Sequence, residues 1–175
     1  MNLLLHTCCA PCASHCVLAL RDLGHRVTLF FSNANIAPHA EYLKRLDSVQ
    51  LLAQRLDVPL CIDEPDHARW LCTVACGFEK EPEKGARCER CFRYSLSRTH
   101  AAMVSDGFDG FTTTLTVSPH KQSTTLFQVG RSLDADRFLA VDFKRNNGFQ
   151  HSLQLTAEWG LYRQNTCGCE FSVRG

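Results

Sequence analysis

The sequence predicts an α/β fold in which a mostly parallel sheet carries helices on both faces. Short apolar runs alternate with amphipathic helical segments along the chain, and this alternation is typical of β-α-β units. Four of the apolar runs end in loops that are polar or carry thiols, and parallel strands bring such loops to one edge of a sheet. A chain of 175 residues can bury a core without disulfides, so a single domain, 1–175, is expected.

Three strands and three helices are expected in the first half of the chain. The apolar run Leu3–Leu5 stops at a cluster of thiols and is typical of a buried strand. From Ala13 the apolar spacing becomes helical, and Gly24 ends that helix. The other elements, in order, are a strand at 26–31, an amphipathic helix at 41–56, a strand at 58–62 and a short helix at 66–76.

A charged segment, Gly77–Ala86, separates the two halves of the chain. It contains Pro82 between two glycines, and we interpret it as a mobile loop over the site instead of a domain boundary. The elements expected after it, in order, are a helix at 87–106, a strand at 108–114, a polar loop at 117–121, a helix ending near 133, a strand at 138–141 and a helix at 147–160.

Composition limits the classes of protein to which this chain can belong. Its net charge of +1 gives no broad basic field for nucleic acid, although a small RNA-binding surface is compatible with it. No apolar run reaches the roughly 18 residues of a membrane span, and the first residues lack the features of a signal peptide. We therefore expect a cytoplasmic protein with no membrane partner. In a reducing compartment, its 11 cysteines favour metal binding or redox chemistry over disulfides.

Two thiol pairs form the strongest candidate site. Cys88 and Cys91 lie three residues apart at a predicted helix start, where the helix dipole lowers thiol pKa values. Cys8 and Cys9 follow the first strand, and the two pairs together supply four thiolates for zinc or an iron–sulfur cluster. A Cys-Cys pair at a strand end is less typical of structural zinc, so we favour iron–sulfur, with zinc or free thiols as alternatives. Cys12 could replace Cys8 or Cys9, hold a second metal, or simply pack at the helix start.

Three further features offer chemistry near the same edge. Cys167-Gly168-Cys169 places two thiols where a small, strained disulfide ring can close, which suits two-electron exchange; the alternative is two more metal ligands. Asp142 closes a strand and could be an acid, a hydrogen-bond acceptor, a metal ligand or an ordinary solvated aspartate. His120 lies in a Ser-Pro-His-Lys loop and is expected to be exposed near the ligand edge, although these residues also suit a helix start.

Six segments spread over nearly the whole chain match one known family in the same order. They are LHTCCAPC at 5–12, SNANI at 32–36 with EY at 41–42, RCERCF at 87–92, TTTLTVSPHK at 112–121, DFK at 142–144, and LYRQ at 161–164 with CGCEFS at 167–172. Any one segment is weak, but the first, fourth and last together are specific. In these segments the chain resembles the QueH-type epoxyqueuosine reductases, small iron–sulfur enzymes of tRNA modification.

The resemblance implies a fold and a reaction. The fold is the three-layer, nucleotide-hydrolase-like Rossmann group. The reaction is the two-electron reduction of the epoxide of epoxyqueuosine, at the wobble position of certain tRNAs, to queuosine. The implied partners are a tRNA anticodon loop carrying epoxyqueuosine and an external electron donor, either a ferredoxin- or flavodoxin-like protein or a small reductant. A modest cationic rim would contact the RNA, and its candidates are Arg87, Arg90, Lys121, Lys144, Arg145 and Arg163.

The resemblance also implies roles for individual residues. The ligands of a [4Fe-4S] cluster would be Cys8, Cys9, Cys88 and Cys91. Cys167 and Cys169 would form a redox-active pair. Cys12 or Asp142 could serve the cluster or an adjacent second metal, an iron ion. The candidate proton donors for the epoxide oxygen are His120, Asp142 and Tyr162.

Two other interpretations account for the same thiols. Cys9-Ala10-Pro11-Cys12 matches a thioredoxin-like CxxC motif, so the chain could be a metal-free thiol–disulfide oxidoreductase. Alternatively, zinc could stabilise a binding module that has no catalytic activity. A brown protein that absorbs near ~400 nm after anaerobic purification would distinguish the iron–sulfur enzyme from both.

Overall fold

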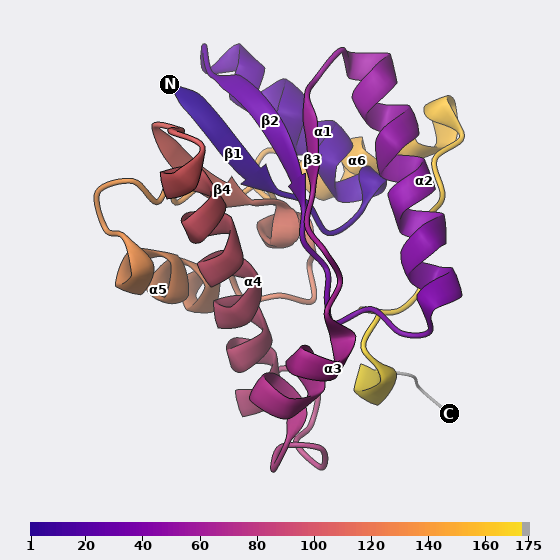
Figure 1. The fold of residues 1–175 in the computed structure, drawn as a ribbon. Coiled ribbons are helices and arrows are strands. Elements are labelled where there is room, and N and C mark those ends of the chain that lie inside the picture. The colour runs from indigo at the N-terminus through magenta and orange to yellow at the C-terminus, as the bar shows by residue number, and fades with distance from the viewer. Residues whose placement is uncertain (173–175) are drawn as a thin grey trace.

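The computed structural model describes residues 1–172 and has a four-stranded, all-parallel sheet at its centre (Figure 1). The strands are β1 (Asn2–His6), β2 (Arg26–Phe31), β3 (Leu60–Ile62) and β4 (Gly110–Thr113), in the spatial order β3-β2-β1-β4. The helices are α1 (Ala10–Asp22), α2 (His39–Leu56), α3 (His67–Trp70, continued by a π-helical turn at Leu71–Ala75), α4 (Ala86–Ser105), α5 (Ser123–Leu133) and α6 (Gly148–Trp159). The predicted α/β fold is confirmed.

Helices cover both faces of the sheet, and the alternating residues of β1 show how the three layers form. Leu3 and Leu5 lie in the core packed by α1, α2 and α6, whereas Leu4 lies in the opposite core, packed by α4 and α5. All three leucines are fully buried, as expected for a parallel strand between two helical layers. Within residues 1–172, no helix is long and apolar enough to cross a membrane.

The strand predicted at 138–141 is wrong. A single bridge joins this segment to β4, and in it the Leu139 amide donates to the Phe111 carbonyl at 2.9 Å. The carbonyls that would continue the ladder instead accept from threonine hydroxyls, that of Thr112 at 2.7 Å and that of Thr116 at 2.9 Å. Because side chains satisfy these backbone groups, the segment has no need of further strand pairing.

Two predicted boundaries also move at the carboxyl edge of the sheet. Helix α1 begins at Ala10 instead of Ala13, because Pro11 fits the first turn, where its missing amide hydrogen would have no helical partner. Strand β4 ends at Thr113, and the chain continues as a 3₁₀ turn over Thr114–Val117. Both shifts bring backbone closer to the thiols that follow β1.

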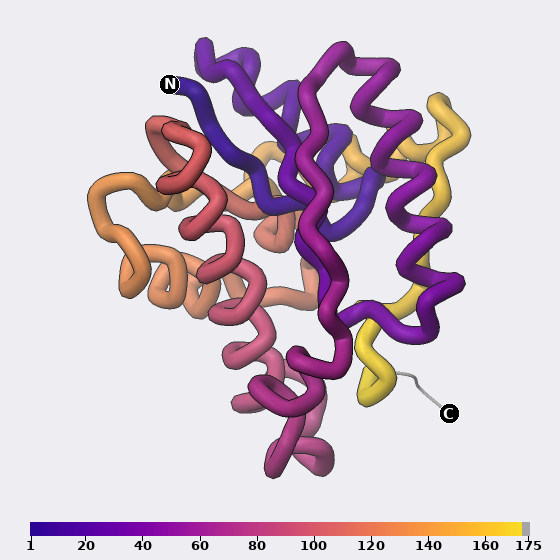
Figure 2. The backbone as a smooth tube through the Cα atoms, in the orientation of Figure 1, coloured from indigo at the N-terminus to yellow at the C-terminus, as the bar shows by residue number. Residues whose placement is uncertain are grey.

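The last described segment runs back along α2 to the carboxyl edge of the sheet (Figure 2). The Tyr162 amide donates to the Ser48 hydroxyl at 3.0 Å, and the Ala37 amide donates to the Gly168 carbonyl at 2.9 Å. The segment then closes in a short 3₁₀ turn at Glu170–Ser172. These contacts bring the C-terminal thiols to the loops that follow β1 and β2.

Candidate active site at the carboxyl edge of the sheet

The ends of β1 and β4 fix the position of Cys8. The two strands pair with His6 opposite Thr113, so the residues that follow leave the sheet side by side. The Cys8 amide donates to the Thr114 hydroxyl oxygen at 3.2 Å, and that hydroxyl donates to the Cys8 sulfur at 3.4 Å. The thiol loop is therefore tied to two strands at the edge where open α/β sheets bind their ligands.

His6 supports this edge and is not a free acid or base. Its Nε2 donates to the Ser32 carbonyl at 3.1 Å, so its Nδ1 accepts from the Thr113 hydroxyl at 2.9 Å. Burial lowers the pKa of the imidazole, which is therefore neutral with both nitrogens engaged. The histidine positions the strand ends instead of moving protons.

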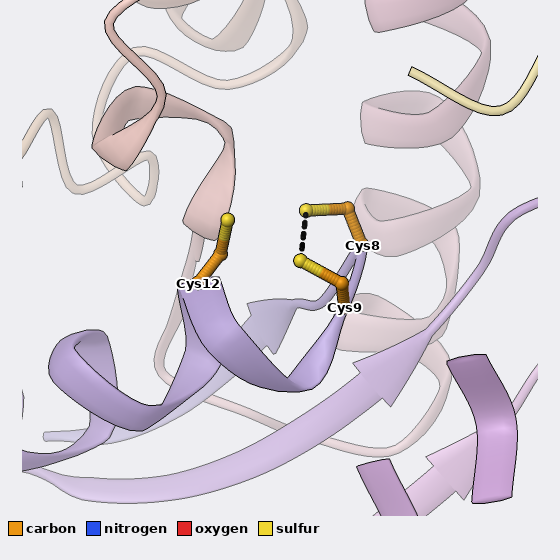
Figure 3. A group of neighbouring side chains, drawn as sticks. All are labelled: Cys8, Cys9 and Cys12. Atoms are coloured by element: carbon orange, nitrogen blue, oxygen red, sulfur yellow. Dashed lines mark hydrogen bonds between the residues drawn. The ribbon is translucent and has the colours of Figure 1, made fainter. Parts of the chain in front are cut away.

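Three thiols converge at the start of α1 (Figure 3). The sulfurs of Cys8, Cys9 and Cys12 all lie within 4.8 Å of one another, and those of Cys8 and Cys9 are 3.6 Å apart. Cys9 is 1% exposed, whereas the other two are partly exposed. Donor sets made only of sulfur select zinc, copper(I) or iron–sulfur clusters. This group of thiols can therefore hold a metal.

The three thiols do not share their protons equally. Hydrogen bonds from Cys12 and Cys9 hold the pKa of Cys8 well below its usual range, although burial opposes them. The bond to Cys8 raises the pKa of Cys12 well above its usual range. A bond from Cys12 opposes the same effect at Cys9, where donation to Cys8 and burial raise the pKa to about 12. Cys8 is therefore the thiolate of the group, and a metal ion meets its charge first.

A cavity of about 610 Å³ opens in front of these thiols. The lining residues that can take part in chemistry are Cys8, Cys12, Cys91, His120, Lys121 and Cys167. They come from the β1–α1 loop, the first turns of α4, the loop after β4 and the C-terminal segment. The fold thus gathers thiols from three distant parts of the sequence around one space, and a volume of this size suits a small ligand or a single nucleotide.

The two α4 thiols differ from each other. Cys91 lines the cavity, whereas the Cys88 sulfur accepts from the Lys84 amide at 3.2 Å. The prediction that the helix start lowers their pKa is wrong, because burial raises the pKa of both thiols and outweighs the helix dipole. The Trp70 indole opposes that rise at Cys91: its Nε1–H is buried, has no other partner within residues 1–172, and faces this sulfur. An orphaned buried donor beside a sulfur fits a metal-bound thiolate.

The predicted four-thiolate set is divided between two walls of the site. Within residues 1–172, the group whose sulfurs lie within ligand distance of one another is Cys8, Cys9 and Cys12, and the α4 thiols stand outside it. Cys12, considered only as a substitute ligand from the sequence, is a full member of the group. The division of ligands between the two walls therefore stays a prediction.

The C-terminal thiols are reduced and have different surroundings. Cys167 lines the cavity, and the Lys121 ammonium donates to its sulfur at 3.4 Å. Cys169 is buried in the small core beside α3. Gly168 between them has φ +112°, and a Cβ there would lie 3.0 Å from the Arg45 guanidinium. Only glycine fits this position.

Arg45 is a site residue that the sequence reasoning missed. It is 2% exposed, its guanidinium donates to the carbonyls of Cys167 at 3.0 Å and Thr166 at 3.2 Å, and it pairs with Glu41 at 2.7 Å. It therefore fixes the backbone that carries the cavity thiol. The available signal was a charged residue beside the apolar stripe of the 41–56 helix, with a glutamate four residues before it.

The predicted cationic rim is partly wrong. Arg87 is 2% exposed and donates to the carbonyls of Phe78 at 2.8 Å and Glu81 at 2.7 Å, so it anchors the charged loop at 77–86 instead of facing RNA. Lys121 faces the cavity thiols. Burial alone would lower its pKa, but the charges of Cys167 and Cys8 raise it above the usual value, so the side chain stays an ammonium.

The three candidate acids lie in different places. His120 lines the cavity. The Asp142 carboxylate lies 3.6 Å from the Lys144 ammonium, and the Tyr162 hydroxyl donates to Glu41 at 2.7 Å. Among the residues described, neither Asp142 nor Tyr162 belongs to the cavity lining. Lys121, which was not predicted as an acid, joins His120 there; the loop between a strand end and a helix was the signal for it.

The thioredoxin-like interpretation does not fit this geometry. An attacking thiol must be accessible and must ionise readily. Cys9, the first cysteine of the CxxC motif, is 1% exposed and has a raised pKa, and the thiolate lies outside the motif at Cys8. The fold and the site instead define an α/β protein with metal-binding thiols at the carboxyl edge of its sheet, facing a ligand cavity.

Known proteins identify the family within that class. A family model described as "Epoxyqueuosine reductase QueH" matches residues 3–175. The chain is 35% identical to the epoxyqueuosine reductase QueH of Streptococcus pyogenes serotype M1, over 99% of this chain and 71% of that protein. It is 32% identical to the QueH of Thermotoga maritima, over 98% and 90%, and 31% identical to that of Acinetobacter baylyi, over 99% and 81%. The chain belongs to the QueH family.

Proposed function

We propose that this protein is an epoxyqueuosine reductase that converts epoxyqueuosine, at the wobble position of a tRNA, to queuosine. The observation that carries the proposal is a thiol group at ligand distance, Cys8, Cys9 and Cys12, facing a cavity of about 610 Å³ in a chain that matches QueH from residue 3 to residue 175. A wobble nucleotide turned out of an anticodon loop is of the right size for that cavity.

The thiols are proposed to hold a [4Fe-4S] cluster, with Cys8, Cys9, Cys88 and Cys91 as its ligands. The sulfur-only donor set and the indole donor beside Cys91 support this choice. Cys12, which lies within the Cys8 group, would serve the cluster or a second metal, an iron ion. When bound, a cluster of this kind supplies one-electron transfers.

The reaction converts an epoxide to an alkene and water, so it consumes two electrons and two protons. Oxidation of the Cys167–Cys169 dithiol to a disulfide releases two electrons and two protons and so balances one turnover. An external donor, a ferredoxin- or flavodoxin-like protein or a small reductant, would then restore the dithiol. Free rotation at Gly168 is what would allow the two sulfurs to meet.

The epoxide oxygen must be protonated before it leaves as water. His120 and Lys121 line the cavity, and Lys121 is kept as an ammonium by the neighbouring sulfurs, so both can present a proton to an oxygen bound there. Ser118 and Arg163 also line the cavity and offer donors for sugar and phosphate oxygens. These side chains would hold the nucleotide with its epoxide toward the thiols.

Anaerobic reconstitution with iron and sulfide, followed by assay on tRNA that contains epoxyqueuosine, tests the proposal. We expect brown protein that absorbs near ~400 nm and mass spectra in which epoxyqueuosine is replaced by queuosine. Colourless protein that binds zinc and leaves the nucleoside unchanged would contradict it and would support a zinc-stabilised binding module.

A further inference from the structure

A second groove lies on the other side of α4 from the thiol cavity. Its volume is about 730 Å³. Cys91 and Ser95 line the thiol cavity, whereas Tyr94 and Ser97 line the groove, so one helix forms a wall of both spaces. The charged lining of the groove is mostly guanidinium, and its arginines are Arg69, Arg90, Arg93 and Arg98.

The groove is more positive than the molecule as a whole. Its four arginines face two carboxylates, those of Asp63 and Asp106, which gives a formal charge of +2 in a chain whose net charge is +1. The remainder of the surface is therefore net negative. Such a concentration of charge attracts an anion to this groove and to few other places.

Two of the four guanidinium groups build the groove, and two are available to a ligand. Arg98 pairs with Asp63, and Arg90 donates to backbone carbonyls of the π-helical turn, that of Val74 at 3.1 Å. Arg93 makes one bond, to the Ser132 hydroxyl. The Arg69 guanidinium makes no hydrogen bond within residues 1–172. The anchored pair positions the wall along which the other pair projects.

We propose that this groove binds the phosphodiester backbone of the tRNA whose wobble nucleotide enters the thiol cavity. The inference rests on the proposed function and adds to it a second point of contact with the substrate. Arginine forks match phosphate oxygens bidentately and keep their charge at any physiological pH. An α-helix with its side chains is about 10–12 Å across, so RNA that crosses α4 can place a base on one side and phosphates on the other.

The shape and chemistry of the groove favour RNA over an acidic protein partner. Specific protein interfaces bury a central apolar patch within about 1,200 Å² or more of surface. The one strongly exposed aliphatic side chain that lines this groove, among residues 1–172, is Ile62. A narrow, cationic groove with one tyrosine beside its arginines instead resembles the backbone-tracking surfaces that hold nucleic acid.

The test is the salt dependence of tRNA binding. We expect the double variant R69Q/R93Q to bind an epoxyqueuosine-containing tRNA about tenfold more weakly at low salt and to lower the slope of log Kd against log [KCl] by about 1.5, since two phosphate contacts are lost. Turnover at saturating tRNA should stay at the wild-type rate, because neither arginine reaches the thiol cavity. R69K/R93K keeps both charges and should retain most of the slope.

A matched control removes the same charge elsewhere. Arg21 and Arg26 lie at the opposite, amino end of the sheet and are exposed, so R21Q/R26Q should leave the slope unchanged. The proposal is overturned if both double variants lower the slope equally, or if R69Q/R93Q binds tRNA normally. Normal tRNA binding with slower turnover from a protein reductant would assign the groove to that acidic partner instead. Binding is read without catalysis, so an inactive wild-type enzyme would refute the proposed function and leave this inference to be judged separately.

Discussion

Cys8 and Cys91 face the same cavity, yet the fold treats their charges in opposite ways. Cys8 accepts hydrogen bonds from two thiols and from the Thr114 hydroxyl, and its pKa is held well below the usual value. Cys91 lies beside a single indole donor, and burial raises its pKa. Proximity to the site therefore does not decide which sulfur is ready to bind a metal; the number of donors around it does.

The contrast has a consequence for how a metal centre assembles. A thiolate that already exists binds a cation without releasing a proton, whereas a neutral thiol must lose one first. The thiols at the end of β1 are therefore the first attachment point, and those of α4 join afterwards. Each prediction below either removes one side of this contrast or measures its size.

Removing the existing thiolate should have the largest effect. We expect Cys8→Ala to lower bound iron after reconstitution, and turnover with it, by more than about 100-fold, because even indirect supports of metal ligands contribute 10–100-fold. Iron and sulfide analysis with the nucleoside assay measures both. Cys72→Ala, at an exposed thiol on the π-helical turn, is the matched control and should behave as wild type. Normal iron content in the Cys8 variant would break the contrast.

Removing the indole donor should have a smaller effect, confined to the α4 side. We expect Trp70→Phe to speed the loss of metal to a chelator by roughly 30-fold, since the ring remains and only the N–H beside the Cys91 sulfur is lost. Trp159→Phe is the control, because that indole donates to the exposed Glu158 carboxylate. If the two variants release metal at the same rate, the indole has no part in holding Cys91.

The same contrast explains what could be read from the sequence. Apolar periodicity and the order of elements predicted the sheet, and the carboxyl-edge rule predicted that Cys8, Cys91 and Cys167 would share one space. Which sulfur carries the charge could not be predicted, because it depends on burial and on donors that come from distant segments. The roles of Lys121 and Arg45 were missed for the same reason: each charge is defined by partners more than 40 residues away.

Lys121 extends the comparison to the third thiol of the cavity. Its ammonium donates to the Cys167 sulfur at 3.4 Å, so Lys121→Gln removes a donor and a positive charge that favour the thiolate. We expect Cys167 in the metal-free protein to be alkylated by iodoacetamide about tenfold more slowly at pH 7, as followed by peptide mass spectrometry. Lys121→Arg should restore most of the rate. Equal rates in all three proteins would show that the ammonium does not activate this thiol.

Asp63 repeats the logic of Cys8 in a carboxylate and should show the smallest effect. Burial raises its pKa, but hydrogen bonds from Arg98 and Ser32 more than offset this and hold it below the usual value. A lowered pKa in the folded state stabilises the protein above the unfolded pKa of about 4, and the contribution is lost as the pH falls through the folded value. We therefore expect Asp63→Asn to reduce the free energy of unfolding by roughly 1–2 kcal/mol at pH 7.

The pH dependence separates this charge effect from a simple loss of packing. The gap in urea-unfolding free energy between wild type and Asp63→Asn should narrow as the pH is lowered from 5 to 3, because the wild-type carboxylate then becomes protonated and loses its advantage. Asp47→Asn, at an exposed position of α2, should show no such trend. A gap that stays constant over this range would mean that Asp63 acts through shape alone, and that hydrogen-bond donors do not hold partly buried charge here as they do at Cys8.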